Sequence, residues 1–239
     1  MAGYAEVPLS KQLTLSVGLK DHATFANYFS KQNAELVSEL RRLVAGEGER
    51  VIYLYGSGGM GCTHLAQACC HYANEFNLSS IYLPLNSLFS ISPKVLEGLE
   101  NLPLVCIDDI QTIVGNQSWE EAFLYFYNRL LAAGGRLVIA AKAAPKSLKL
   151  ILADVASRLS AGVVYALQPL SDEEKLQALI KRAELRGLIL SEEVANYILT
   201  HCPRHMTTLF SALEILDKES LATKRRPTIP FVKEVLEII

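Results

Sequence analysis

The chain has 239 residues, of which 50% are apolar and 20% are charged. This composition is typical of a folded globular protein and excludes collagen-like and generally disordered chains. Lysine and arginine total 23 against 25 aspartate and glutamate residues, which gives a net charge of -2. Proteins that hold nucleic acid through their own phosphate contacts usually carry a basic excess, so we expect any link to DNA to be indirect.

The sequence shows no sign of a membrane or secretory route. No apolar stretch approaches the ~20 residues needed to cross a bilayer, and the start MAGYAEVPLSKQ lacks the apolar core of a secretory signal. The cysteines form no CxxC pair and no Cys/His cluster with zinc-ligand spacing. We therefore expect a cytoplasmic protein without membrane partners and with reduced thiols at Cys62, Cys69, Cys70, Cys106 and Cys202.

The first two thirds of the chain alternate between helical and strand-like segments. Residues 1–20 show no helical periodicity and are expected to form an exposed tail, whereas apolar residues at helical spacing predict a helix over 33–44. Strands buried on both faces and alternating with helices predict a parallel five-stranded α/β sheet sandwiched by helices, over residues 21–168. Apolar runs place the strands at 51–55, 80–85, 104–108, 136–141 and 163–167, and helices are expected over about 61–76 and from Ser118.

Two capping boxes mark the starts of helices. Ser118 pairs with Glu121, and Ser171 pairs with Glu174, each three residues further on. After Pro169 no strand-like run remains, so residues 169–239 are expected to form a small all-α lid domain. Within it, helices are expected after Ser191 and over 205–222 and 230–238, and the basic segment 218–227 is expected to be a solvated turn.

The segment GSGGMGCT (56–63) lies between the first strand and a helix, where a phosphate-binding loop belongs. Glycines free the backbone N–H groups to converge on an anion, and the helix behind them adds the positive end of its dipole. The segment matches the P-loop pattern GxxxxGK[ST] except at the lysine, which is Cys62. Without the lysine, the pattern alone is also compatible with a flexible strand-to-helix turn.

An acidic pair supports the phosphate-binding interpretation. Asp108 and Asp109 end the strand predicted over 104–108. In such sites one acid and the threonine of the loop, here Thr63, hold Mg²⁺, while the second acid polarises the attacking water. The pair taken alone also fits a strand end that caps the next turn. The two motifs together, on a parallel sheet followed by helices, predict a nucleotide-binding module of the AAA+ type.

Seven blocks of the chain extend this interpretation: ATFANYF (23–29), GMGCTHLAQAC (59–69), LVCIDDI (104–110), WEEAFLYFYNRLL (119–131), DVASRLSAG (154–162), YALQPLSDEEKLQALIKRAELRG (165–187) and TIPFVKEVLEI (228–238). With them, the chain resembles the Hda regulators, the DnaA-related branch of the bacterial AAA+ family, from about Gln12 onwards. DnaA carries a further C-terminal helix-turn-helix domain that binds DNA. This sequence ends at Ile239 within the lid, so we expect that domain to be absent.

The resemblance implies a set of nucleotide-binding residues. Residues 23–29 and Asn33 would lie against the adenine, and the nucleotide is expected to be ADP, with Mg²⁺ at Thr63 and Asp108 when it is bound. The resemblance also implies that Arg158 is an arginine finger acting in trans, whereas without it Arg158 reads as a surface arginine in a salt bridge. The expected nucleotide-binding residues are Phe25, Asn33, Gly56, Gly58, Gly59, Met60, Gly61, Cys62, Thr63, His64, Asp108 and Asp109.

Two further positions depart from the family. The lid arginine of the family falls within RHMTTLF (204–210), where this chain has Thr207, and Ala140, Ala141 and Lys142 replace a polar sensor after the fourth strand. Each charge-assisted contact to a phosphate contributes roughly 1.5–3 kcal/mol, so the losses at Cys62 and Thr207 are expected to weaken nucleotide binding. Lys142 and Arg204 are the two candidates for replacement cations.

The tail contains a short linear motif. Gln12, Leu13, Leu15 and Val17 resemble the segment by which this family attaches to the sliding clamp of DNA polymerase III, with Leu15 and Val17 filling an apolar groove. Taken alone, the same residues read as an edge strand.

The favoured function is a clamp-tethered adaptor that promotes ATP hydrolysis by DnaA and so prevents over-initiation of chromosome replication. Its own ATPase activity is expected to be negligible, its partners are DnaA and the clamp, and DNA is reached only through the clamp. Two alternatives stay open, a DnaA-paralogue scaffold that does not activate hydrolysis and a self-sufficient AAA+ ATPase or helicase loader. Self-association also stays open.

Overall fold

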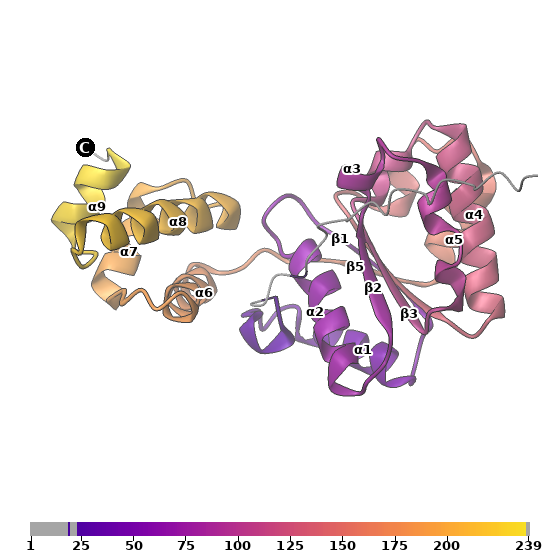
Figure 1. Ribbon diagram of the computed structural model, residues 1–239, viewed down its shortest axis with the longest axis horizontal. Helices are drawn as coiled ribbons and strands as arrows, with labels where there is room; N and C mark the ends of the chain where they lie inside the picture. Colours follow the sequence, from indigo (N-terminus) through magenta and orange to yellow (C-terminus); the bar gives the residue numbers. More distant parts are fainter. Residues whose placement is uncertain (1–18, 20–22, 238–239) are drawn as a thin grey trace, which may run out of the picture.

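The computed structural model describes residue 19 and residues 23–237. Figure 1 shows an α/β core at one end of the molecule and a group of helices at the other, joined by one extended connection. The motif of Gln12, Leu13, Leu15 and Val17 lies outside the described residues. None of the helices that the structure describes is long and apolar enough to cross a membrane.

The core contains a five-stranded parallel sheet, as predicted. Its strands are β1 (Val51–Tyr55), β2 (Ser80–Pro84), β3 (Leu104–Asp108), β4 (Arg136–Ala141) and β5 (Val163–Ala166), in the order β2-β3-β4-β1-β5. Ile139 pairs with both Tyr53 of β1 and Ile107 of β3, so these three strands end close together. The loops after β1, β3 and β4 therefore meet at one edge of the sheet.

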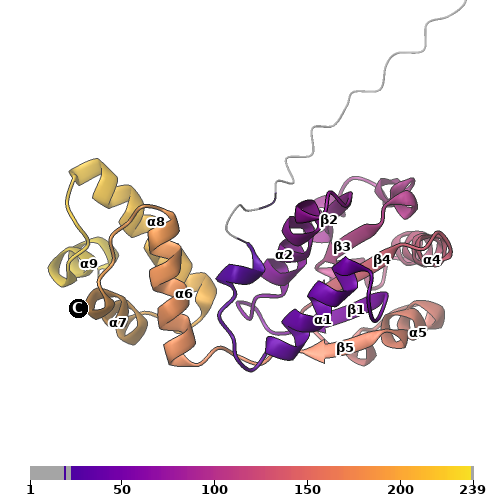
Figure 2. The same cartoon turned by 90° about the horizontal axis from the view of Figure 1, so that it is seen from below.

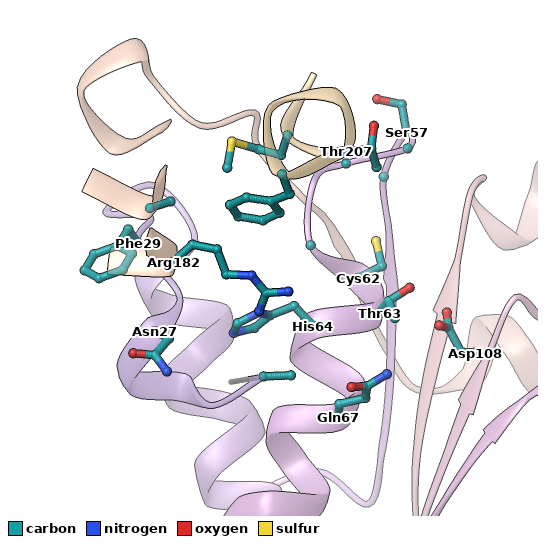
Figure 3. Close-up of a pocket in the computed structure, with 18 of the residues that line it drawn as sticks. Asn27, Phe29, Ser57, Cys62, Thr63, His64, Gln67, Asp108, Arg182 and Thr207 are labelled. Carbon is teal, nitrogen blue, oxygen red and sulfur yellow. The ribbon is translucent and has the colours of Figure 1, made fainter. Parts of the chain in front are cut away.

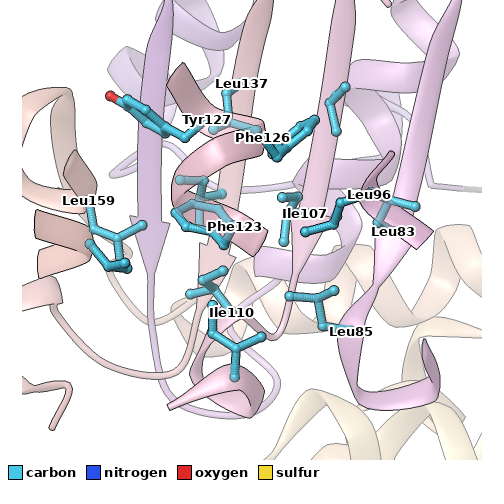
Figure 4. Packing of buried hydrophobic residues seen from close by; sticks show 14 of the residues in the cluster. Leu83, Leu85, Leu96, Ile107, Ile110, Phe123, Phe126, Tyr127, Leu137 and Leu159 are labelled. Carbon is cyan, nitrogen blue, oxygen red and sulfur yellow. The ribbon is translucent and has the colours of Figure 1, made fainter. Parts of the chain in front are cut away.

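Helices cover both faces of the sheet (Figures 1 and 2). Helices α1 (Ala34–Ala45) and α2 (Cys62–Glu75) bury residues such as Ile52 and Cys106. Helices α4 (Gln117–Ala132) and α5 (Ala153–Ala161) bury the alternate residues, including Ile107, against Phe123 and Leu159 (Figure 4). The remaining elements of the core are α3 (Leu85–Leu88) and the 3₁₀ turns η1 (Phe25–Asn27), η2 (Pro93–Leu96), η3 (Leu99–Asn101), η4 (Ile110–Ile113) and η5 (Pro145–Ser147).

The predicted start of α4 is wrong by two residues. Asn116 is the N-cap, and its side-chain oxygen accepts a hydrogen bond of 3.2 Å from the amide of Trp119. Ser118 lies inside the first turn, so the Ser118–Glu121 capping box does not form. Asparagine caps a helix as well as serine does, and Gly115 at φ +81° turns the chain into position just before it.

The lid consists of α6 (Asp172–Leu185), α7 (Glu192–His201), α8 (Met206–Thr223) and α9 (Ile229–Leu236), packed around a separate apolar cluster. The Ser171–Glu174 capping box at the start of α6 is confirmed. The turn predicted over 218–227 is wrong in its first half, because α8 continues to Thr223 and ends at Lys224 in the left-handed conformation. The domain boundary at residue 168 stays a prediction.

Three hydrogen bonds link the base of the lid to the segment before α1. The side-chain amide of Asn33 donates to the carbonyl of Gln168 at 2.9 Å and accepts from its amide at 2.8 Å. The amide of Lys31 donates to Glu174 Oε1 at 2.6 Å. These contacts help to hold the lid over the edge of the sheet where the three loops meet.

Candidate nucleotide site

The glycine-rich loop (56–63) connects β1 to α2 in a conformation that glycine permits. Gly59 and Gly61 have φ values of +86° and +101°, in the left-handed region that favours glycine. A Cβ atom on Gly61 would also lie only 2.7 Å from the ring of Tyr28. Gly61 is the N-cap of α2 and has no side chain to satisfy the first amides of the helix, which leaves them available to an anion.

A cavity of about 450 Å³ opens between this loop, the carboxyl ends of β3 and β4, and the lid (Figure 3). Its volume lies in the range of small-molecule and cofactor sites. The structure brings nine of the predicted nucleotide-binding residues to its wall: Gly56, Gly58, Gly59, Gly61, Cys62, Thr63, His64, Asp108 and Asp109.

Three predicted residues, Phe25, Asn33 and Met60, do not line this cavity. Phe25 is buried in the core, with its ring edge-on to Tyr72. The polar atoms of Asn33 are used in the bonds to Gln168, and Met60 packs against the core cluster beside α2. The 3₁₀ turn η1 sends Phe25 inward, and from this segment Ala23, Asn27 and Phe29 reach the cavity instead.

Asp108 is a buried carboxylate with several donors. Tyr82 Oη donates to Oδ2 at 2.8 Å, and the amide of Asp109 donates to Oδ1 at 2.9 Å. Burial raises the pKa of Asp108, and hydrogen bonds from Thr63 and Tyr82 partly oppose the shift. Thr63 and Asp108 thus adjoin, as a Mg²⁺ pair requires. Among the described residues no group of three or more His, Cys, Asp or Glu forms a metal site, so a metal here would also need oxygens from a ligand.

Asp109, the candidate for polarising water, is already paired. Its Oδ1 accepts from Gln111 Nε2 at 2.6 Å and lies 3.3 Å from Lys142 Nζ. Lys142 therefore reaches the cavity, but its charge is directed at Asp109. Arg204, the other candidate for a replacement cation, forms an exposed pair with Asp172 at 2.7 Å and does not line the cavity.

The loop side of the cavity carries no cationic side chain. Burial, and then the nearby charge of Asp108, raise the pKa of the Cys62 thiol to about 12, so it is neutral at physiological pH. Burial lowers the pKa of His64. The Nε2 atom of His64 lies 2.8 Å from the carbonyl oxygen of Thr24, which can only accept, so Nε2 carries the proton of a neutral ring.

The lid supplies a wall that the sequence predictions missed. Ala178, Arg182 and Leu185 of α6 line the cavity together with Thr207 and Phe210 of α8. Arg182 points into the cavity in Figure 3. The spacing of Ala178, Arg182 and Leu185 places them on one helical face, which is the only signal in the sequence that could have grouped them.

The fit to a nucleotide is therefore mixed. The loop, its uncapped helix, Thr63 and Asp108 match a site for phosphates and Mg²⁺, and the cavity is large enough for a nucleoside. The lysine and the lid arginine are missing, as the sequence indicated, because Cys62 and Thr207 occupy those places. The residues fit binding better than they fit turnover.

Comparisons with known proteins agree with this geometry. A family model for the lid domain of Hda matches residues 172–236, and a model for the bacterial DnaA ATPase domain matches residues 91–166. Domain III of the replication initiation protein DnaA from Thermotoga maritima superposes with a TM-score of 0.80 at 22% identity, over 92% of this chain and 98% of that chain. AMPPCP-bound DnaA from Aquifex aeolicus superposes with a TM-score of 0.68 at 19% identity, over 86% and 70%. The RuvB branch-migration motor of Thermotoga maritima gives 0.69 at 16% identity, over 90% and 71%.

Proposed function

Since the chain is an Hda/DnaA-like AAA+ protein, we propose that it is a clamp-tethered adaptor that promotes ATP hydrolysis by DnaA. Hydrolysis would end the competence of DnaA to initiate chromosome replication. The observation that carries this proposal is the position of Arg158, which is exposed on α5 and does not line the cavity of its own chain.

Arg158 is suited to act on a phosphate in another molecule. Its guanidinium lies 5.9 Å from the centre of the Tyr127 ring, which restrains the side chain without neutralising it. In the described part of the chain it forms no ion pair, so the surface salt bridge weighed from the sequence is absent. A planar guanidinium can span two phosphate oxygens and stabilise charge that develops during phosphoryl transfer.

The helix that carries Arg158 is firmly held. The carboxylate of Glu120, which is fully buried, accepts hydrogen bonds from the amides of Gly115, Ile151 and Leu152 at 2.8–3.1 Å. Leu152 is the N-cap of α5, so Glu120 satisfies amides at the start of that helix. A helix that is already held in place loses little conformational entropy when its side chain binds in a partner's site.

The cavity between core and lid would hold an adenine nucleotide, ADP by preference, without turning ATP over. Solved DnaA structures with AMPPCP support an adenine nucleotide as the ligand class. Thr63 and Asp108 would hold Mg²⁺, which neutralises phosphate charge when bound. The neutral Cys62 thiol and the pairing of Asp109 with Lys142 both argue against hydrolysis in this cavity.

Attachment to the DNA polymerase sliding clamp rests on the motif of Gln12, Leu13, Leu15 and Val17. The clamp would bring the protein to DNA, which is consistent with a chain that has no basic excess of its own.

The test measures hydrolysis by ATP-loaded DnaA with this protein and a DNA-loaded clamp. We expect acceleration by the wild-type protein, loss of it in Arg158→Ala, and loss of clamp retention in a pull-down of the Gln12→Ala and Leu15→Ala double variant. Arg42→Ala is the control, because Arg42 is an exposed arginine on α1 that pairs with Glu39 and does not line the cavity. Full activity of Arg158→Ala would favour a scaffold, and steady ATP turnover without DnaA, abolished by Asp109→Asn, would favour a self-sufficient ATPase.

A further inference from the structure

We propose that Arg182 of α6 binds a phosphate group of the nucleotide, so that the lid supplies the cation that the glycine-rich loop lacks. This inference rests on the proposed nucleotide binding in the cavity. It assigns the ligand as a nucleoside diphosphate held between the glycine-rich loop and the lid. The replacement cation is then Arg182, which lines the cavity, and not Arg204, which does not.

Arg182 extends from the lid into the cavity, as Figure 3 shows. The cavity wall across from the lid includes Thr63 and His64, in the first turn of α2. The side chain of Arg182 is only 10% exposed, although it ends in a cavity that opens to solvent. A cation in this position faces a bound ligand rather than bulk water.

Arg182 has a buried donor that the described part of the protein leaves unused. In the described part of the chain, Arg182 Nε is one of two buried side-chain polar atoms without a hydrogen-bond partner. Arg182 Nη2 lies 3.9 Å from Glu214 Oε1, which is too long for a hydrogen bond. That oxygen lies 2.7 Å from Arg186 Nη2, so the carboxylate of Glu214 serves Arg186 first. The guanidinium also lies over the face of Phe210, 5.4 Å from the ring centre.

A buried cation without sufficient counter-charge is unfavourable, and an anion in the cavity would relieve it. Burial and then the charge of Arg186 lower the pKa of Arg182, which Glu214 only partly opposes. Lys181, the preceding residue, shows the opposite arrangement. It also lines the cavity, but it is 40% exposed and pairs with Glu184 at 2.8 Å.

A second feature of the lid points to the same ligand. The N-cap of α8, His205, makes no side-chain capping bond, so its side chain satisfies none of the first amides of this 18-residue helix. The backbone nitrogens of Met206 and Thr207 lie 3.4 and 3.6 Å from the position that a Cβ atom on Gly59 would occupy. The positive ends of α2 and α8 therefore converge at the loop, where phosphates are expected to lie.

The experiment is calorimetric titration of the full-length protein with ADP. We expect Arg182→Met, which keeps the packing on Phe210, to weaken ADP binding roughly ten- to hundredfold. Arg182→Lys should retain part of the affinity, and wild-type binding should weaken more steeply with added KCl than that of Arg182→Met. Arg204→Met is the matched control, because Arg204 is an exposed lid arginine that pairs with Asp172 and does not line the cavity, and its expected change in ADP affinity is below about twofold.

A folding readout separates a ligand-binding role from a structural one. Without nucleotide, Arg182→Met should unfold at the same temperature as the wild type or higher, because it removes a poorly compensated buried charge. A lower unfolding temperature together with unchanged ADP affinity would show that Arg182 serves the lid and would overturn the proposal.

Three other outcomes are informative. Equal ADP affinity in wild type and Arg182→Met overturns this inference and leaves the nucleotide site standing. If Arg182→Lys is as weak as Arg182→Met and the dependence on KCl is unchanged, Arg182 stacks on the base and the phosphate assignment is overturned. If the wild type binds no ADP, both this inference and the nucleotide site fail, whereas stimulation of DnaA through Arg158 is measured separately.

Discussion

The cavity and the region around α5 differ in which of their charged groups have partners. In the cavity, Asp109 is paired with Lys142, and the buried Nε of Arg182 has no hydrogen-bond partner among the described residues. Around α5, the buried carboxylate of Glu120 accepts hydrogen bonds from three backbone amides, and Arg158 is exposed, with its guanidinium 5.9 Å from the centre of the Tyr127 ring. One region can gain from a ligand, and the other presents a cation that is ready to act elsewhere.

This difference bears on whether the cavity binds a nucleotide or also hydrolyses it. A site that turns over ATP needs a base free to orient water and a cation on the β- and γ-phosphates. In the described residues, Asp109 is paired with Lys142 and the loop carries a neutral Cys62, so the base is not free and the cation proposed for the phosphates is Arg182 of the lid. Under the proposed function, Arg158 on α5 would complete the site of a partner and would need no substrate in its own chain. Four experiments test this difference.

The largest effect is expected at Arg158. Arginine supplied in trans is typically worth about 10³–10⁵ in rate, so Arg158→Ala should remove nearly all stimulation of DnaA hydrolysis. Arg158→Lys should recover only part of it, because an ammonium lacks the planar fork. Single-turnover hydrolysis at saturating protein measures both, and complete rescue by lysine would reduce Arg158 to a simple point charge.

The next effect concerns the support of α5. Glu120→Ala leaves three amides without their acceptor, and we expect the free energy of unfolding to fall by about 3 kcal/mol or more. Glu121→Ala, at the next and exposed position, should change it by less than about 0.5 kcal/mol. Urea unfolding compares the two. Similar losses in both variants would show that Glu120 has no special part in holding the α5 face.

Cys62→Lys tests whether the cavity lacks only a cation. The added charge should tighten ADP binding by roughly tenfold or more, yet ATP turnover should stay negligible while Lys142 occupies Asp109. Calorimetry and phosphate release measure the two quantities. Steady ATP turnover in the Cys62→Lys variant would contradict this prediction, because it would show that the cavity is an ATPase site that lacks only the lysine.

The smallest effect concerns Glu174, which caps α6 and accepts from Lys31. Burial raises its pKa, but the amides of Lys31 and Ser171 outweigh burial, so the net shift is below the ordinary value of 4.5. Because the folded state holds this proton more weakly than the unfolded chain, Glu174 stabilises the fold above pH 4.5. That contribution is lost as the pH falls through the folded-state value.

Thermal unfolding of Glu174→Gln should therefore show a loss of about 1 kcal/mol at pH 7 that shrinks toward pH 3. Glu173→Gln, at an exposed position beside it, serves as the control. A loss that stays constant between pH 7 and pH 3 would assign the effect to shape rather than to charge.

Local patterns predicted the parts of the site that lie on the core side. The loop, Thr63, Asp108 and Asp109 sit at strand ends, and parallel strands bring their carboxyl ends to one edge. The lid wall was not predictable in the same way, because the face that α6 turns to the cavity depends on how two separately packed domains meet. Phe25 shows a related limit, since a 3₁₀ turn decided which side of its segment points inward. At α4, two nearby polar residues can each cap a helix, and the structure has Asn116 and not Ser118 as the N-cap.

The double hydrogen bond between Asn33 and Gln168 has a mechanical consequence. A side-chain amide that donates to and accepts from the same residue fixes the backbone there as a neighbouring strand would. The capping box then begins at Ser171, so only Pro169 and Leu170 separate two anchored points. The lid is therefore joined to the core through two residues, and the φ angle of one of them, Pro169, is fixed by its ring. Rotation at these two residues would move α6 and α8 together as one rigid body. Arg182 and Thr207 would then approach or leave the loop together.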